Sequence, residues 1–181
     1  MVLLTVGLLL PLTACGGGDP RAPAEAPAPS PAPGEAAVEI LQFQRIPTHC
    51  FTDPAEPGVV RIRSLEELSA YMDAHGEQYD FSRKRESFGD GTLGLLDLYD
   101  DLEAQPEFFT DRELLLIPIT EGSSSTAYQP EALRSSGTDW TLTLRRLPAE
   151  QGVDSMGYWH LALTIPDAIP PEAEISLVIA G

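Results

Sequence analysis

The sequence is poor in basic residues and in cysteine, and none of its apolar runs is long enough to cross a membrane as a helix. Lys and Arg total 11 against 28 Asp and Glu, which gives a formal net charge of −17. This balance argues against a nucleic-acid partner, because phosphates require a basic surface. It also argues against a domain that lies flat on anionic lipid. A basic protein partner, a bound cation or plain solubility remains compatible with it.

The longest apolar run stands at the N-terminus. Residues 2–12 match the core of a signal peptide, whereas a membrane-spanning helix needs about 20 apolar residues. The segment Leu12–Cys15, Leu-Thr-Ala-Cys, resembles the lipobox of bacterial lipoproteins. The resemblance implies cleavage after residue 14, acylation of Cys15 with diacylglycerol and palmitate, and attachment to the lipid bilayer on the extracytoplasmic face of the cell membrane. More than one acyl chain makes such an anchor stable.

Basic residues are absent from the segment before Cys15, although signal peptides normally open with Lys or Arg. An internal start at Met1 would account for this difference. The alternative is an ordinary secretory signal with an unmodified cysteine.

Cys50 is the only thiol left once Cys15 carries lipid, so an intramolecular disulfide is excluded and stability must come from core packing. We expect Cys50 to be a small buried side chain. His49 beside it suggests a Cys–His nucleophile. However, adjacent residues of a strand point to opposite faces, which places this pair poorly for catalysis.

Residues 15–37 hold the lipidated cysteine and a Pro/Ala-rich tether. Such a segment has too little apolar bulk to form a core, and its prolines favour an extended polyproline conformation. At about 3.1 Å per residue the tether could reach roughly 50–60 Å. We therefore expect a stalk that carries the folded domain away from the membrane.

Residues 38–181 are predicted to form a single domain. One helix begins at Ser64, where Ser64 and Glu67 form a capping box, and stops at Gly76. A second runs from about Leu93 to Ala104. The predicted strands are Val38–Ile46, Val59–Arg63, Leu114–Ile119, Thr126–Leu133, Trp140–Leu144, Tyr158–Ile165 and Ile175–Ile179.

This order of elements predicts the α+β class. We expect a twisted, mainly antiparallel sheet that could curl toward a sandwich, with about two helices packed on one side or end. The continuous apolar run Leu114–Ile119 indicates burial on both faces. Pro118 within it predicts a bulge or a partly open edge.

Three motifs suggest ligand sites, and each has a simpler explanation. Gly89–Gly94 matches a dinucleotide fingerprint but lacks the buried strand that must precede it, so a turn is expected. The basic cluster Arg83-Lys84-Arg85 could bind an anion or simply offset nearby acids. Asp97, Asp100 and Asp101 share a helix face, whereas calcium ligands gather on a curled loop.

One catalytic arrangement is conceivable: His160 with a serine from Ser123–Ser125. His160 is expected on the face of its strand opposite the large apolar side chains. The serine run lacks the glycine spacing and the strand-to-helix context of a hydrolase elbow.

The stretch from about Phe108 to Ile179 resembles the C-terminal domain of the PrcB family, named for a subunit of a surface protease complex. The likeness lies in Phe108-Phe109 before the apolar strand, in a small-residue hairpin ending near Tyr128, and in the strands Trp140–Leu144 and Tyr158–Pro166. The family's Gly-Gly-Tyr-like hairpin differs here, where serines follow Gly122. The resemblance implies an exported, non-catalytic accessory module.

The leading hypothesis is therefore a membrane-anchored surface lipoprotein whose domain binds another protein, with no cofactor, no metal and no catalytic residue. Two alternatives remain: an exported hydrolase with an unfamiliar Ser/His site, and a solute- or cation-binding lipoprotein with a deep polar pocket.

Overall fold

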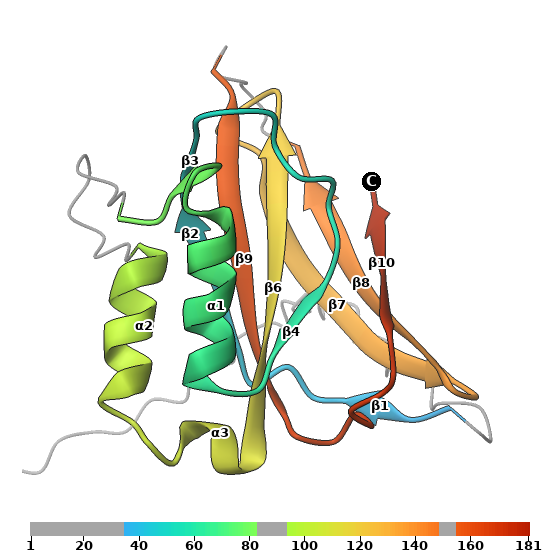
Figure 1. The fold of residues 1–181 in the computed structure, drawn as a ribbon. Helices are drawn as coiled ribbons and strands as arrows, with labels where there is room; N and C mark the ends of the chain where they lie inside the picture. The colour runs from blue at the N-terminus through green and yellow to red at the C-terminus, as the bar shows by residue number, and fades with distance from the viewer. Residues whose placement is uncertain (1–34, 83–93, 149–154) are drawn as a thin grey trace, which may run out of the picture. The chain divides into compact units, whose positions relative to one another are not determined.

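The structure is a computed structural model that describes residues 35–82, 94–148 and 155–181 (Figure 1). The chain divides into two compact units, Met1–Ser30 and Pro31–Gly181, and all described residues belong to the second. The lipobox with Cys15, nearly all of the tether, Arg83-Lys84-Arg85 and most of the Gly89–Gly94 motif lie outside the described residues.

The predicted α+β class is confirmed. The described residues contain the helices α1 (Leu65–His75), α2 (Leu95–Glu103) and α3 (Phe108–Asp111). Their strands are β1 (Ala37–Val38), β2 (Gln42–Pro47), β3 (His49–Cys50), β4 (Val60–Ile62), β5 (Tyr79–Asp80), β6 (Arg112–Glu121), β7 (Ala127–Ser136), β8 (Asp139–Leu147), β9 (Gly157–Pro166) and β10 (Ile175–Ala180).

The long strands form two sheets, where a single sheet that could curl toward a sandwich was predicted. The first sheet has the order β2-β9-β6-β4 and is antiparallel throughout. The second sheet has the order β1-β7-β8-β10, and its β8–β10 pair is parallel. The short strands β3 and β5 pair with each other.

The first sheet is the middle of three layers. Leu114 and Leu116 of β6 pack with side chains of α1, α2 and α3, whereas Leu115 and Ile117 pack with side chains of β7 and β8. The helices thus cover one face of the first sheet, and the second sheet covers the other (Figure 1). The predicted burial of Leu114–Ile119 on both faces is confirmed. Each large apolar side chain buried in this way contributes about 1.5–3 kcal/mol.

Helix α1 begins as predicted. The backbone N–H of Glu67 donates to Ser64 Oγ at 3.1 Å, while the Glu67 carboxylate accepts from the backbone N–H of Arg63 at 2.7 Å. Tyr71 of this helix is buried with Leu68 against the first sheet.

The predicted strand Val38–Ile46 is two strands. β1 pairs with β7 in the second sheet, and β2 pairs with β9 in the first. The chain therefore passes from one sheet to the other at residues 39–41. A loose apolar alternation could not reveal this step, because both halves have a buried face.

The strands accommodate their two prolines in different ways. Pro118 causes no bulge: it pairs with His160 in an unbroken register, two residues beyond the last residue of β6 that pairs with β4. The expected partly open edge at Pro118 is therefore present. Pro130 does not break β7, which continues to Ser136 with a register shift between Pro130 and Ala132.

Two glycines are required by geometry. Gly137 in the β7–β8 turn has φ +67°, a left-handed conformation that side chains disfavour. A Cβ on Gly157 would lie 2.2 Å from the Trp159 ring and 2.9 Å from Ser124 Cα, so the start of β9 packs closely on the serine turn.

Among the described helices, none is long and apolar enough to cross a membrane.

Candidate functional site

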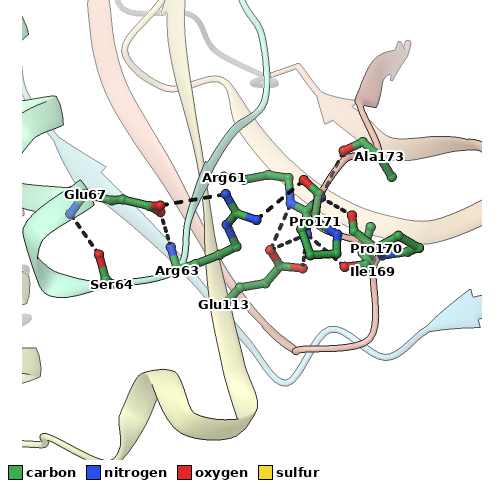
Figure 2. Close-up of polar contacts among 9 residues, drawn as sticks. All are labelled: Arg61, Arg63, Ser64, Glu67, Glu113, Ile169, Pro170, Pro171 and Ala173. Atoms are coloured by element: carbon green, nitrogen blue, oxygen red, sulfur yellow. Dashed lines mark hydrogen bonds and ion pairs between the residues drawn. The ribbon is translucent and has the colours of Figure 1, made fainter.

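The most extensive polar cluster of the described residues joins the first sheet to the loop between β9 and β10 through Arg61 of β4 (Figure 2). Arg61 Nε donates to Glu113 Oε2 at 2.9 Å, and Nη2 donates to Glu113 Oε1 at 3.0 Å. The Glu113 side chain is fully buried and that of Arg61 is 11% exposed. Such a two-point pair fixes the guanidinium plane relative to β6.

The remaining N–H groups of Arg61 hold the loop between β9 and β10. Nη2 donates to the Ile169 carbonyl at 3.0 Å, and Nη1 donates to the Pro170 and Ala173 carbonyls at 2.8 and 2.9 Å. A guanidinium has five N–H donors, and all five are engaged here. The cluster has no donor left for a substrate, so its role is to position the loop that leads into β10.

The charge of Glu113 depends on this arginine. Burial raises the pKa of Glu113 above its usual value, while the hydrogen bonds and charge of Arg61 oppose that rise. Removing Arg61 would leave a buried carboxylate with no counter-charge, which is the costly case for a buried ion pair.

His160 of β9 is fully buried on the helix side of the first sheet, opposite the large apolar side chains as predicted. Its Nε2 lies 2.8 Å from Tyr71 Oη, and its Nδ1 lies 3.4 Å from Thr48 Oγ1. The rings of Tyr79 and Phe81 lie edge-on at 4.9 and 5.5 Å. Burial, with a smaller contribution from His75, lowers the pKa of His160 to about 4. It is therefore neutral at physiological pH.

The structure does not bring His160 together with the serine run Ser123–Ser125. His160 pairs with Pro118, and the serines follow Glu121, at least three residues or about 10 Å further along β6. Ser124 Oγ instead hydrogen-bonds Ser155 Oγ at 2.8 Å. The hydrogen-bond partners of His160 are a tyrosine and a threonine, so the predicted Ser/His arrangement is not assembled.

The structure also keeps His49 and Cys50 apart, and it gives Asp97 a structural role. His49 is exposed and Cys50 is buried, on opposite faces as predicted, and Cys50 Sγ donates to the Thr52 carbonyl at 3.0 Å. Asp97 accepts from the backbone N–H of Gly94 at 2.7 Å and so caps α2. Within residues 35–82, 94–148 and 155–181, no group of three or more His, Cys, Asp or Glu side chains is placed to hold a metal ion.

A groove runs between α2 and β2. It has a volume of about 140 Å³ and is lined by both polar and apolar side chains. The residues that line it are Gln42, Gln44, Leu98, Asp101, Leu102, Gln105, Phe108, Arg112, Leu114, Ala162 and Thr164. Ligand pockets usually measure about 300–1,000 Å³, so this groove is smaller than that range. A more open hollow of about 510 Å³ lies beside it and is lined by residues of the segment 105–112.

A second charged cluster closes the far end of the sheets. Arg146 of β8 donates from Nε and Nη2 to the two carboxylate oxygens of Glu121, both at 2.7 Å, and Tyr128 also donates to Glu121. The hydrogen bonds from Arg146 lower the pKa of Glu121. This pair joins β6 of the first sheet to β8 of the second sheet.

One exposed feature was not predicted. Phe51, directly after β3, is 59% exposed, the highest value among the large apolar side chains described. Its ring lies edge-on to His49 at 5.3 Å, and His49 lies edge-on to Tyr158 at 6.3 Å. We call His49, Phe51 and Tyr158 the aromatic patch. A phenylalanine beside a turn of polar residues was the only available sequence signal.

The Arg61 cluster generates a stability prediction. Arg61→Met should lower the free energy of unfolding by about 3–5 kcal/mol, because Glu113 is left buried without its partner. The double variant Arg61→Met, Glu113→Leu should recover much of the loss, since it removes both charges. Urea unfolding of the full chain measures both. Equal stability of wild type and Arg61→Met would contradict the role assigned to the pair.

His160 generates a pH prediction. The unfolded chain binds a proton at His160 below about pH 6.5, whereas the folded chain does so only near pH 4. The free energy of unfolding should therefore decrease as the pH is lowered from about 6.5 to about 4. This group alone should account for a decrease of up to about 3 kcal/mol. His160→Gln keeps a neutral polar side chain and should remove that component. Urea unfolding of both chains at several pH values measures the difference, and parallel curves would refute the assignment.

No protein-family model, curated protein or solved structure matches this chain.

Proposed function

We propose that this protein is a lipoprotein of the bacterial cell envelope, anchored through acylated Cys15 on the extracytoplasmic face, whose domain binds a protein partner without catalysis. The lipobox Leu12–Cys15 and the Pro/Ala-rich tether support the anchor. The resemblance of residues 108–179 to the PrcB C-terminal domain supports an accessory module.

The buried polar groups of the core already bond to one another, and this supports a binding role over a catalytic one. Every buried side-chain nitrogen and oxygen in the described part of the chain has a hydrogen-bond partner. Arg61, Glu113 and His160 each bond to the domain itself. Catalytic groups, by contrast, must face a substrate.

The observation that carries the binding proposal is the aromatic patch. Aromatic side chains are enriched at protein interfaces and often provide most of the binding energy. Phe51 is mostly exposed, which costs solvation free energy unless a partner covers it. The net charge of −17 favours a partner with a basic rim around its apolar contact. We therefore assign the patch to a basic protein.

The anchor is tested by metabolic labelling. Cells that express the full chain and receive labelled palmitate should label the wild type and leave Cys15→Ala unlabelled, because the acyl chains attach at that sulfur. The variant should also leave the membrane fraction. An unlabelled wild type that partitions entirely into the medium would contradict the anchor.

The partner is tested by cross-linking in intact envelopes, followed by recovery of the full chain. Phe51→Ala should lower recovery of the cross-linked partner about tenfold or more, because a central aromatic contact is lost. Leu96→Ala is the matched control, since Leu96 is also exposed, at 46%, but lies on α2 outside the patch. A basic partner should also be recovered less well at high salt. If Phe51→Ala and Leu96→Ala recovered the same amount of cross-linked partner, the aromatic patch would be excluded as the binding surface.

A further inference from the structure

The two four-stranded sheets have four outer strands, and three of them carry features that block further pairing. β1 and β4 contain only two and three residues. β2 carries Arg45 and ends at Pro47. Short length, charge and proline are the features that protect sheet edges from other chains. β10 has none of them: its six residues, Ile-Ser-Leu-Val-Ile-Ala, include no charge, proline or glycine.

β10 is also exposed on both faces at its C-terminal end. Val178 is 46% exposed and Ile179 is 38% exposed, and these neighbours point to opposite sides of the strand. Among the described residues, β10 pairs with β8 alone and forms an edge of the second sheet (Figure 1). About half of its backbone N–H and C=O groups therefore point away from β8.

The charges at the two ends of β10 have opposite signs. Glu174 is exposed and directly precedes the strand, while Arg145 of β8 lies beside Ala180 at the other end. The Arg145 side chain is half exposed, contacts Glu131 at 3.4 Å through Nε and donates to Gln129 Oε1 at 2.6 Å from Nη2. Its guanidinium has five N–H donors, so a second carboxylate can be bound beside these partners. A parallel second strand would set Glu174 against Glu174. An antiparallel strand would bring each Glu174 toward the Arg145 of the other copy.

We propose that β10 pairs with β10 of a second copy of this chain, antiparallel across a two-fold axis, so that the two second sheets become one continuous sheet. A two-fold axis perpendicular to the sheet leaves the faces that cover the two first sheets on the same side of the continuous sheet. Paired residues must then point to the same side, so the residue on the axis pairs with its own copy in the partner. With Leu177 on the axis, Ile175 lies opposite Ile179 and Glu174 lies opposite Ala180.

This register matches the chemistry of both faces. Ile175, Leu177 and Ile179 lie on one side of the strand and meet only one another across the axis. On the other side, the small Ala180 lies between Glu174 of one copy and Arg145 of the other, within reach of the two long side chains. The pairing does not involve the aromatic patch, so a test of the pairing is independent of the proposed protein partner.

Disulfide trapping in cells that express the full chain tests the register. Leu177→Cys should form a cross-linked dimer under mild oxidation, because residues on the axis lie about 4.5–5.5 Å apart. As Leu177 is partly buried, a second pair keeps the test independent of folding. Ser176→Cys co-expressed with Val178→Cys should cross-link more than either variant alone. Thr141→Cys on β8 is the control. Cross-linking no stronger than that of Thr141→Cys in both designs would overturn the proposal.

Native mass spectrometry of the detergent-released full chain then tests the interaction itself. The wild type should be a dimer, and Val178→Lys should weaken it about tenfold or more, because a charge on this edge blocks strand pairing. Glu174→Arg should also weaken it, and Arg145→Glu in the same chain should restore it. A wild type that stays monomeric, or that binds only a different protein at this edge, would overturn the proposal.

Discussion

The pairing of β6 with β9 is the interaction on which the rest of the domain depends. Ten residue pairs, from Arg112–Pro166 to Glu121–Gly157, join the two strands without a break. Their side chains supply both cores, one shared with the helices and one shared with the second sheet. Because both faces are buried, each other element is held by packing against this pair, and a change in its register would disturb both cores at once.

The buried polar residues of this frame position segments of the domain itself. Arg61 and Glu113 hold the loop that leads to β10, and Glu121 with Arg146 joins the first sheet to β8. His160 sits neutral in a cage of aromatic rings. On the surface, the aromatic patch and the β10 edge expose apolar groups. These exposed apolar groups are consistent with the proposed role of an anchored accessory protein.

The sequence predicted the local features well, because their signals are local. The apolar run Leu114–Ile119, the Ser64–Glu67 cap and the opposite placement of His49 and Cys50 each follow from periodicity or capping chemistry. The division into two sheets and the Arg61–Glu113 pair depend on contacts between distant residues, 52 apart in the second case. An arginine inside a short apolar strand and a glutamate at the start of the most apolar strand were signals for that pair. The small helix α3 and the strands β3 and β5 are too short for any periodicity to show.

Hydrogen exchange of the backbone amides of the full chain, followed by mass spectrometry, tests the central claim most directly. If the β6–β9 pair organises the domain, amides of Leu114–Ile119 and Leu161–Ile165 should be the slowest to exchange and should open only with global unfolding. Peptides of α1, α2 and β7 should exchange earlier. The account would be contradicted if β6 and β9 exchanged as fast as those outer elements, because the frame would then lie elsewhere.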